Sequence, residues 1–114
     1  MPAAIAYTSV YEKRAGKILR AEERNAMELH VASTPETHPV VAGTGGVRKA
    51  RWSRRGKGKR GGVRVIYFYR SGLAGQGVDV VYFLDIYAKT TKENLTPADK
   101  HQLKELINRL KGVQ

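Results

Sequence analysis

Residues 63–87 read VRVIYFYRSGLAGQGVDVVYFLDIY, two apolar runs separated by a glycine-rich segment. The first run, Val63 to Tyr69, is rich in β-branched and aromatic residues and predicts a strand. The second run, Val78 to Tyr87, is almost continuously apolar, as expected of a central strand that is buried on both faces. With Ser71 to Gly77 as the turn, the two runs predict an antiparallel hairpin.

A strongly basic segment leads into this hairpin. Gly43 to Tyr69 carries nine of the chain's 21 Lys and Arg residues and no acidic residue, so most of the net charge of +11 resides there. Val47 to Ser53 alternates well enough for a strand, with Lys49 and Arg51 on one face. Arg54 to Gly62 is too rich in Gly and charge to be anything but loop. A cationic loop mounted on a sheet is suited to holding a polyanion.

The N-terminal part of the chain predicts a strand and two helices. Ala4 to Val10 has the composition of a short strand. Tyr11 to Leu19 has apolar residues at helical spacing, although Gly16 weakens this pattern. Ala21 to Ala32 is the better helix, and Pro35 to Gly46 after it is expected to be loop. The apolar stripe of the second helix is expected to consist of Ala26, Leu29 and Ala32.

The C-terminal part predicts one more helix. Thr96 suits the N-cap position, Pro97 the first helical position and Asp99 the third. Its core face is expected to consist of Leu103, Leu106, Ile107 and Leu110. The predicted order is therefore β-α-α-β-β-β-α, a single α+β domain over residues 1–114. Its mostly antiparallel sheet should pack against two N-terminal helices and a C-terminal helix.

Composition restricts the possible partners. The chain has 114 residues, no cysteine and 41% hydrophobic residues, which suits one modest core and excludes disulfides and thiolate chemistry. No apolar run approaches the roughly 18 residues of a membrane span, and no signal-peptide pattern opens the chain. The basic residues alternate with Gly, which a membrane-surface helix would not tolerate. We therefore expect a soluble, cytoplasmic protein whose partner is nucleic acid and not a membrane.

Three segments carry a family resemblance: GTGGVRKARW, GKGKRGGVRVIYFY and IYAKTTKENLTPAD. In order and spacing they resemble the RelE/HigB family of bacterial toxins, the toxin halves of type II toxin–antitoxin pairs, and most closely its HigB-like branch. The resemblance implies a RelE-like fold and ribosome-dependent cleavage of mRNA in the decoding site. It also implies inhibition by a protein antitoxin, which we expect to be a helix-turn-helix protein encoded beside this chain. The C-terminal tyrosine of the RelE branch has no match, since Leu95 lies near that position.

Cleavage of RNA through its 2′-hydroxyl needs a proton acceptor, positive charge for the transition state and help for the leaving oxygen. Lys57 or Lys59 is the candidate base, because neighbouring like charges lower the pKa of a lysine. Arg64 lies inside an apolar strand, and its fixed guanidinium suits transition-state stabilisation. By the resemblance it matches a strand arginine that RelE toxins use in this role. The alternative is a structural arginine at the sheet edge, paired with Asp79 or Asp85.

Two residues at the end of the next strand complete the catalytic candidates. Tyr87 and Lys89 are two residues apart and so share a face; Tyr87 is suited to stack on a base or relay a proton. The alternative is a core tyrosine and a surface lysine. Tyr67, by strand parity, faces away from Arg64 and should pack in the core. The expected RNA contacts are Arg48, Lys49, Arg51, Arg54, Arg55 and Arg60, although Arg48 should point away from Lys49 and Arg51.

Other chemistries receive no support from the sequence. His30, His38 and His101 fall in separate elements, so we expect no metal site. The glycine pattern of residues 56–61 leads into a strand and not a helix, so we expect no nucleotide cofactor. Two rival functions remain open: a non-catalytic RNA- or ribosome-binding protein, and a ParE-like poison of DNA gyrase.

Overall fold

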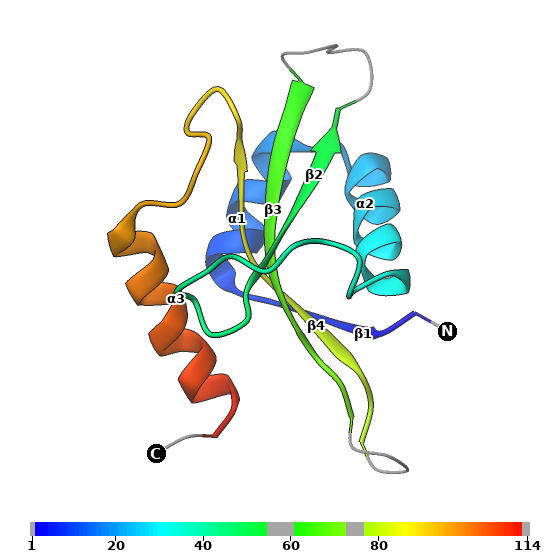
Figure 1. Cartoon of the computed structure of the whole chain (residues 1–114). Helices are drawn as coiled ribbons and strands as arrows, with labels where there is room; N and C mark the ends of the chain where they lie inside the picture. Colours follow the sequence, from blue (N-terminus) through cyan, green and yellow to red (C-terminus); the bar gives the residue numbers. More distant parts are fainter. Residues whose placement is uncertain (1, 55–60, 73–76, 113–114) are drawn as a thin grey trace.

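A computed structural model of the chain describes residues 2–54, 61–72 and 77–112. It has a four-stranded sheet between two layers of helices (Figure 1). The element order confirms the predicted α+β class and the order β-α-α-β-β-β-α. The elements are β1 (Ala4–Tyr7), α1 (Ser9–Ile18), α2 (Ala21–Ser33), β2 (Arg48–Ser53), β3 (Gly62–Arg70), β4 (Val80–Ala88) and α3 (Pro97–Leu110).

The sheet has the strand order β1-β4-β3-β2. Strand β1 pairs parallel with β4, whereas β2–β3 and β3–β4 are antiparallel, so the predicted hairpin and the mostly antiparallel sheet are confirmed. Both hairpin strands are interior, and β4 is flanked by β1 and β3 as its apolar sequence predicts. Any side chain on β3 therefore lies between two neighbouring strands and not at an edge.

The sheet separates two hydrophobic cores. Figure 1 shows α1 and α2 on one face of the sheet and α3 on the other. Each fully buried large side chain in these cores contributes about 1.5–3 kcal/mol to stability. The first core, beneath α1 and α2, includes Tyr11, Met27, Val31, Val65, Tyr67 and Phe83. The second core, beneath α3, includes Val47, Ile66, Phe68, Leu84, Tyr87, Leu95 and Ile107.

Helix α3 begins where the sequence predicts. The Thr96 side chain accepts a hydrogen bond from the Asp99 amide and the Asp99 carboxylate accepts one from the Thr96 amide, which is a complete capping box. Pro97 follows at the first helical position. The predicted apolar face also holds, because Ile107 is fully buried and Leu103, Leu106 and Leu110 pack around it. Within the described residues, no helix is long and apolar enough to span a membrane.

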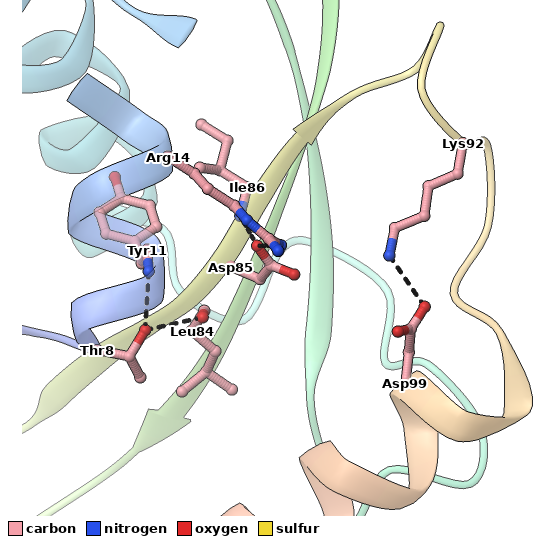
Figure 2. A network of polar contacts seen from close by, with 8 residues as sticks. All are labelled: Thr8, Tyr11, Arg14, Leu84, Asp85, Ile86, Lys92 and Asp99. Carbon is pink, nitrogen blue, oxygen red and sulfur yellow. Dashed lines mark hydrogen bonds and ion pairs between the residues drawn. The ribbon is translucent and has the colours of Figure 1, made fainter. Parts of the chain in front are cut away.

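A β-bulge interrupts the pairing of β3 with β4. Ile66 pairs with Asp85 but the next residue, Tyr67, pairs with Phe83, so Leu84 is the extra residue. The Leu84 carbonyl accepts a hydrogen bond of 2.9 Å from the Thr8 hydroxyl, which itself caps α1 by accepting from the Tyr11 amide at 3.0 Å (Figure 2). A bulge shifts the alternation of the strand that carries it, so residues after Leu84 change faces.

Two N-terminal predictions were wrong. The first strand ends at Tyr7 and not at Val10, because Thr8 caps α1 and Val10 already lies in the helix. The stripe of α2 is also rotated: Leu29 is 55% exposed, and the buried residues are Met27, Glu28, Val31 and Ala32.

Glu28 explains this rotation. Its carboxylate accepts hydrogen bonds from the Tyr7 hydroxyl at 3.0 Å, the Tyr11 hydroxyl at 2.7 Å and the Arg24 Nε at 2.8 Å. The polar network therefore turns the Glu28 side of α2 toward the sheet, and apolar periodicity alone does not reveal it.

Candidate active site

Basic side chains from β2, from β3 and from the residue that follows β4 gather on the sheet face that carries the second core. The cross-strand register places Arg51 of β2 opposite Arg64 of β3, and Arg64 opposite Tyr87 of β4. Lys49 shares the face of Arg51, because Ala50 between them packs into the first core. We call this set the cationic face; its members are Lys49, Arg51, Arg64, Tyr87 and Lys89.

Arg64 is the buried centre of the cationic face. It is 7% exposed, and its Nη2 donates to the Glu93 carboxylate at 2.6 Å. Its Nε is buried without a hydrogen-bond partner among the described residues. The structural alternative of an edge arginine paired with Asp79 or Asp85 was wrong. The reason is that β3 is interior, and Asp85 is bound instead by Arg14 at 2.7 Å (Figure 2).

Tyr87 lies directly across from Arg64. Its ring packs in the second core, yet its hydroxyl has no hydrogen-bond partner in the described part of the chain. Burial raises the pKa of Tyr87, and the positive charge of Arg64 opposes that shift only in part. The hydroxyl is therefore protonated at neutral pH and is a hydrogen-bond donor and not a base. The Nζ of Lys92 lies 4.8 Å from the centre of the ring.

Lys89 follows the last residue of β4 and reaches back over β3. Its amide donates to the Gly62 carbonyl at 3.0 Å. A Cβ at Gly62 would lie 2.9 Å from the Lys89 side chain. Gly62 and Arg64 are two residues apart and so share a face. The absence of a side chain at Gly62 therefore lets the Lys89 side chain lie over Gly62, on the face that carries Arg64.

The connection from β4 to α3 supplies three residues that the sequence did not single out. Glu93 binds Arg64, Asn94 accepts a hydrogen bond from the Lys49 Nζ at 3.2 Å, and Lys92 covers Tyr87. The hydrogen bond from Arg64 is the main cause that lowers the pKa of Glu93; the charges of Arg51 and Lys49 add to it. The sequence gives only a weak signal for this contact: Glu93 is a single carboxylate in a connection that follows the basic strands.

The remaining predicted RNA contacts are distributed differently. Arg48 points to the opposite face, as expected, and donates to the backbone carbonyls of Glu36 and His38 at 3.1 and 2.7 Å. Arg54 lies at the base of the basic loop, where its Nε donates to the Gly61 carbonyl at 3.3 Å. Four predicted residues, Arg55, Lys57, Lys59 and Arg60, lie outside the described residues.

Two histidines meet although the sequence places them in separate elements. The ring centres of His30, on α2, and His38, in the loop that follows α2, are 5.8 Å apart, so this loop folds back toward the helix. The described residues include no group of three or more His, Cys, Asp or Glu side chains that could hold a metal ion.

Two matches to known proteins bear on the family and the fold of this chain. The family model described as RelE toxin of the RelE / RelB toxin-antitoxin system matches residues 13–114. Among solved structures, a free-state mutant of the E. coli toxin RelE, with two arginines replaced by alanine, is similar with a TM-score of 0.51 and 17% sequence identity. The alignment covers 82% of this chain and 90% of that chain. At this identity, the structural match shows a shared fold.

Proposed function

The chain belongs to the RelE toxin family, and from this premise we propose that it is a ribosome-dependent mRNA endoribonuclease that arrests translation. The observation that supports cleavage most directly is Arg64, a guanidinium buried in an interior strand opposite Tyr87. Burying a charge is costly, so a protein that only binds RNA would keep its arginines at the surface. The same observation favours a nuclease over a gyrase poison, because a gyrase poison does not need a buried cation to stabilise a phosphate transition state.

The reaction we propose is attack of a 2′-oxygen on the adjacent phosphorus. The 2′-hydroxyl loses its proton, the new P–O2′ bond forms and the P–O5′ bond breaks, which leaves a 2′,3′-cyclic phosphate and a 5′-hydroxyl. Arg64 stabilises the additional negative charge on the phosphorane-like transition state. Lys57 or Lys59 accepts the proton of the 2′-hydroxyl. No cofactor or metal ion takes part in this scheme.

We assign Tyr87 and Lys89 to the other half of the reaction. Tyr87 keeps its proton at neutral pH and can donate it, or a hydrogen bond, to the leaving 5′-oxygen. Lys89 lies over Gly62 on the face of Arg64 and would add a second positive charge near the phosphate. Lys49 and Arg51 extend the cationic face along β2 and bind neighbouring phosphates. We further propose a cognate antitoxin whose acidic segment neutralises this face, as a helix-turn-helix protein encoded alongside.

The test is to express the chain in bacteria and map the 5′ ends of cellular mRNA. We expect growth arrest and new ends within translated codons, which disappear in an Arg64→Ala, Lys89→Ala double variant. The matched control is Lys13→Ala, Arg109→Ala, which removes the same two kinds of charge from exposed positions on α1 and α3. Purified protein should cleave mRNA on stalled ribosomes and leave free mRNA intact. Unchanged transcripts, or identical ends from the double variant, would overturn the proposal.

A further inference from the structure

We propose that Glu93 is an internal substitute for the RNA phosphate: it occupies Arg64 in the free chain and must be displaced when RNA binds. This inference rests on the proposed RNA-cleaving function and adds a self-masking step to the same site. Glu93 then acts through Arg64, as a residue that sets the affinity of the site for phosphate.

The contact geometry indicates that the carboxylate is an incomplete partner. Glu93 takes one nitrogen of Arg64, the Nη2, at 2.6 Å. The Nε of Arg64 remains without a partner among the described residues although it is buried. A guanidinium can present Nε and Nη2 together to two oxygens of one anion. A phosphodiester has two non-bridging oxygens and would satisfy both nitrogens, so it should replace Glu93 with a gain in hydrogen bonds.

A second unsatisfied donor belongs to the residue that pairs with Arg64 on the neighbouring strand. The Tyr87 hydroxyl is buried without a partner in the described part of the chain, and its residue pairs with Arg64 across β3 and β4. Buried polar groups are normally hydrogen-bonded, so two neighbouring exceptions call for a missing ligand. Both groups donate, which specifies an anionic, oxygen-rich ligand.

The segment that holds Glu93 is anchored on both sides of this residue, so only the Glu93 side chain has to move. Lys92 is tied to α3 by an ion pair with Asp99 at 3.0 Å (Figure 2). Leu95 is buried in the second core. Between these two anchors the Glu93 side chain is 53% exposed, whereas that of Arg64 is 8% exposed. The carboxylate can therefore turn into water while the arginine stays in place.

Protonation does not release this contact under ordinary conditions. The pKa of Glu93 lies below its usual value because Arg64 donates to the carboxylate. The carboxylate is thus ionised at neutral pH and competes with other anions for Arg64. The buried charge of Arg64 is compensated in both states, first by Glu93 and then by the phosphate.

The experiment measures binding of a fluorescent single-stranded RNA that carries 2′-O-methyl groups throughout and cannot be cleaved. Glu93→Gln keeps the size of the side chain and removes its charge; we expect binding to tighten about fivefold, as for loss of a partly exposed ion pair. The control is Glu105→Gln, which removes the same charge from a side chain that is 61% exposed on α3. In an Arg64→Met background the gain from Glu93→Gln should vanish.

The outcomes separate the two proposals. Equal gains from Glu93→Gln and Glu105→Gln would mean that only net charge matters, and would overturn the inference. So would weaker binding by Glu93→Gln, or a gain that survives in the Arg64→Met background. Because the probe cannot be cleaved, a specific gain from Glu93→Gln stands even if the mRNA assay finds no nuclease. Conversely, active wild-type protein with no gain refutes the masking step alone.

Discussion

At the scale of single residues, removing the hydroxyl of Tyr87 distinguishes a role in core packing from a role in the reaction. Tyr87→Phe keeps the ring in the second core and removes a buried hydroxyl that has no partner among the described residues. We expect the free energy of unfolding to stay within about 0.5 kcal/mol of wild type, because no hydrogen bond is lost. Single-turnover cleavage on stalled ribosomes should fall about 100-fold or more if the hydroxyl assists the leaving oxygen.

Tyr67→Phe is the matched control for this prediction. The Tyr67 hydroxyl donates to the Pro35 carbonyl at 2.7 Å on the opposite face of the sheet, where strand parity predicts it. Its loss should cost about 1 kcal/mol of stability and leave cleavage unchanged. If Tyr87→Phe cleaves at the wild-type rate, Tyr87 is a core residue and takes no part in the reaction.

His38 makes stability depend on pH. Burial lowers its pKa, the charges of His30 and Arg48 lower it further, and its Nε2 has no partner in the described residues. Above the unfolded-state value of about 6.5, histidine is neutral in both states and has no effect. Below it, the unfolded chain takes up a proton that the folded chain refuses, so stability decreases as pH falls toward the folded pKa.

Urea unfolding between pH 7.5 and pH 5 measures this effect. We expect the wild-type free energy of unfolding to fall across the range and the curve of a His38→Gln variant to be flatter. His101→Gln is the control, because His101 is an exposed side chain on α3. Parallel curves for wild type and His38→Gln would show that His38 is not the responsible group.

At the scale of elements, the bulge at Leu84 determines which face Tyr87 occupies. Phe83 packs in the first core, and without an inserted residue Tyr87, four positions later, would point the same way. The bulge moves Tyr87 to the face of Arg64. Thr8 holds this arrangement, because its hydroxyl joins the Leu84 carbonyl to the start of α1.

We therefore expect Thr8→Ala to lower the free energy of unfolding by about 1–2 kcal/mol, through loss of the helix cap and of the bond to the bulge. Thr8→Ser keeps the hydroxyl and should stay within about 0.5 kcal/mol of wild type. Chemical denaturation of the three proteins gives the comparison. Equal losses from the two substitutions would mean that the methyl group, and not the hydroxyl, is what the site requires.

The elements themselves were largely predictable, because their signals are local. The hairpin follows from its apolar runs, and α3 follows from the capping residues Thr96 and Asp99 and its apolar spacing. The bulge and the contact of Glu93 with Arg64 were not predictable, since both depend on pairing between residues far apart in sequence. In the same way, the alternation of residues along β2 and β3 predicted which basic side chains share a face, but it did not predict that the Glu93 carboxylate binds Arg64 there.

At the scale of the whole molecule, the two faces of the sheet pair their charges differently. The α1 and α2 side carries Glu28, a buried carboxylate that pairs with Arg24 and accepts hydrogen bonds from two tyrosines. The α3 side carries the cationic face, and its basic residues exceed the carboxylates that contact them there. RNA should therefore bind by the α3 side of the molecule, although exposed basic residues also occur on α1.

The salt dependence of RNA binding tests this asymmetry. Replacing Lys49, Arg51 and Lys89 with Gln removes three charges from the cationic face. For a single strand, the slope of log affinity against log salt should become shallower by about 2, because each phosphate contact contributes about 0.7.

Replacing the exposed Lys13, Lys17 and Arg20 with Gln removes the same kinds and number of charges from the region of α1. This control should leave the slope within about 0.5 of wild type, since those residues meet no phosphate. If both triple variants change the slope equally, RNA is held by net charge and not by the face that β2, β3 and β4 build.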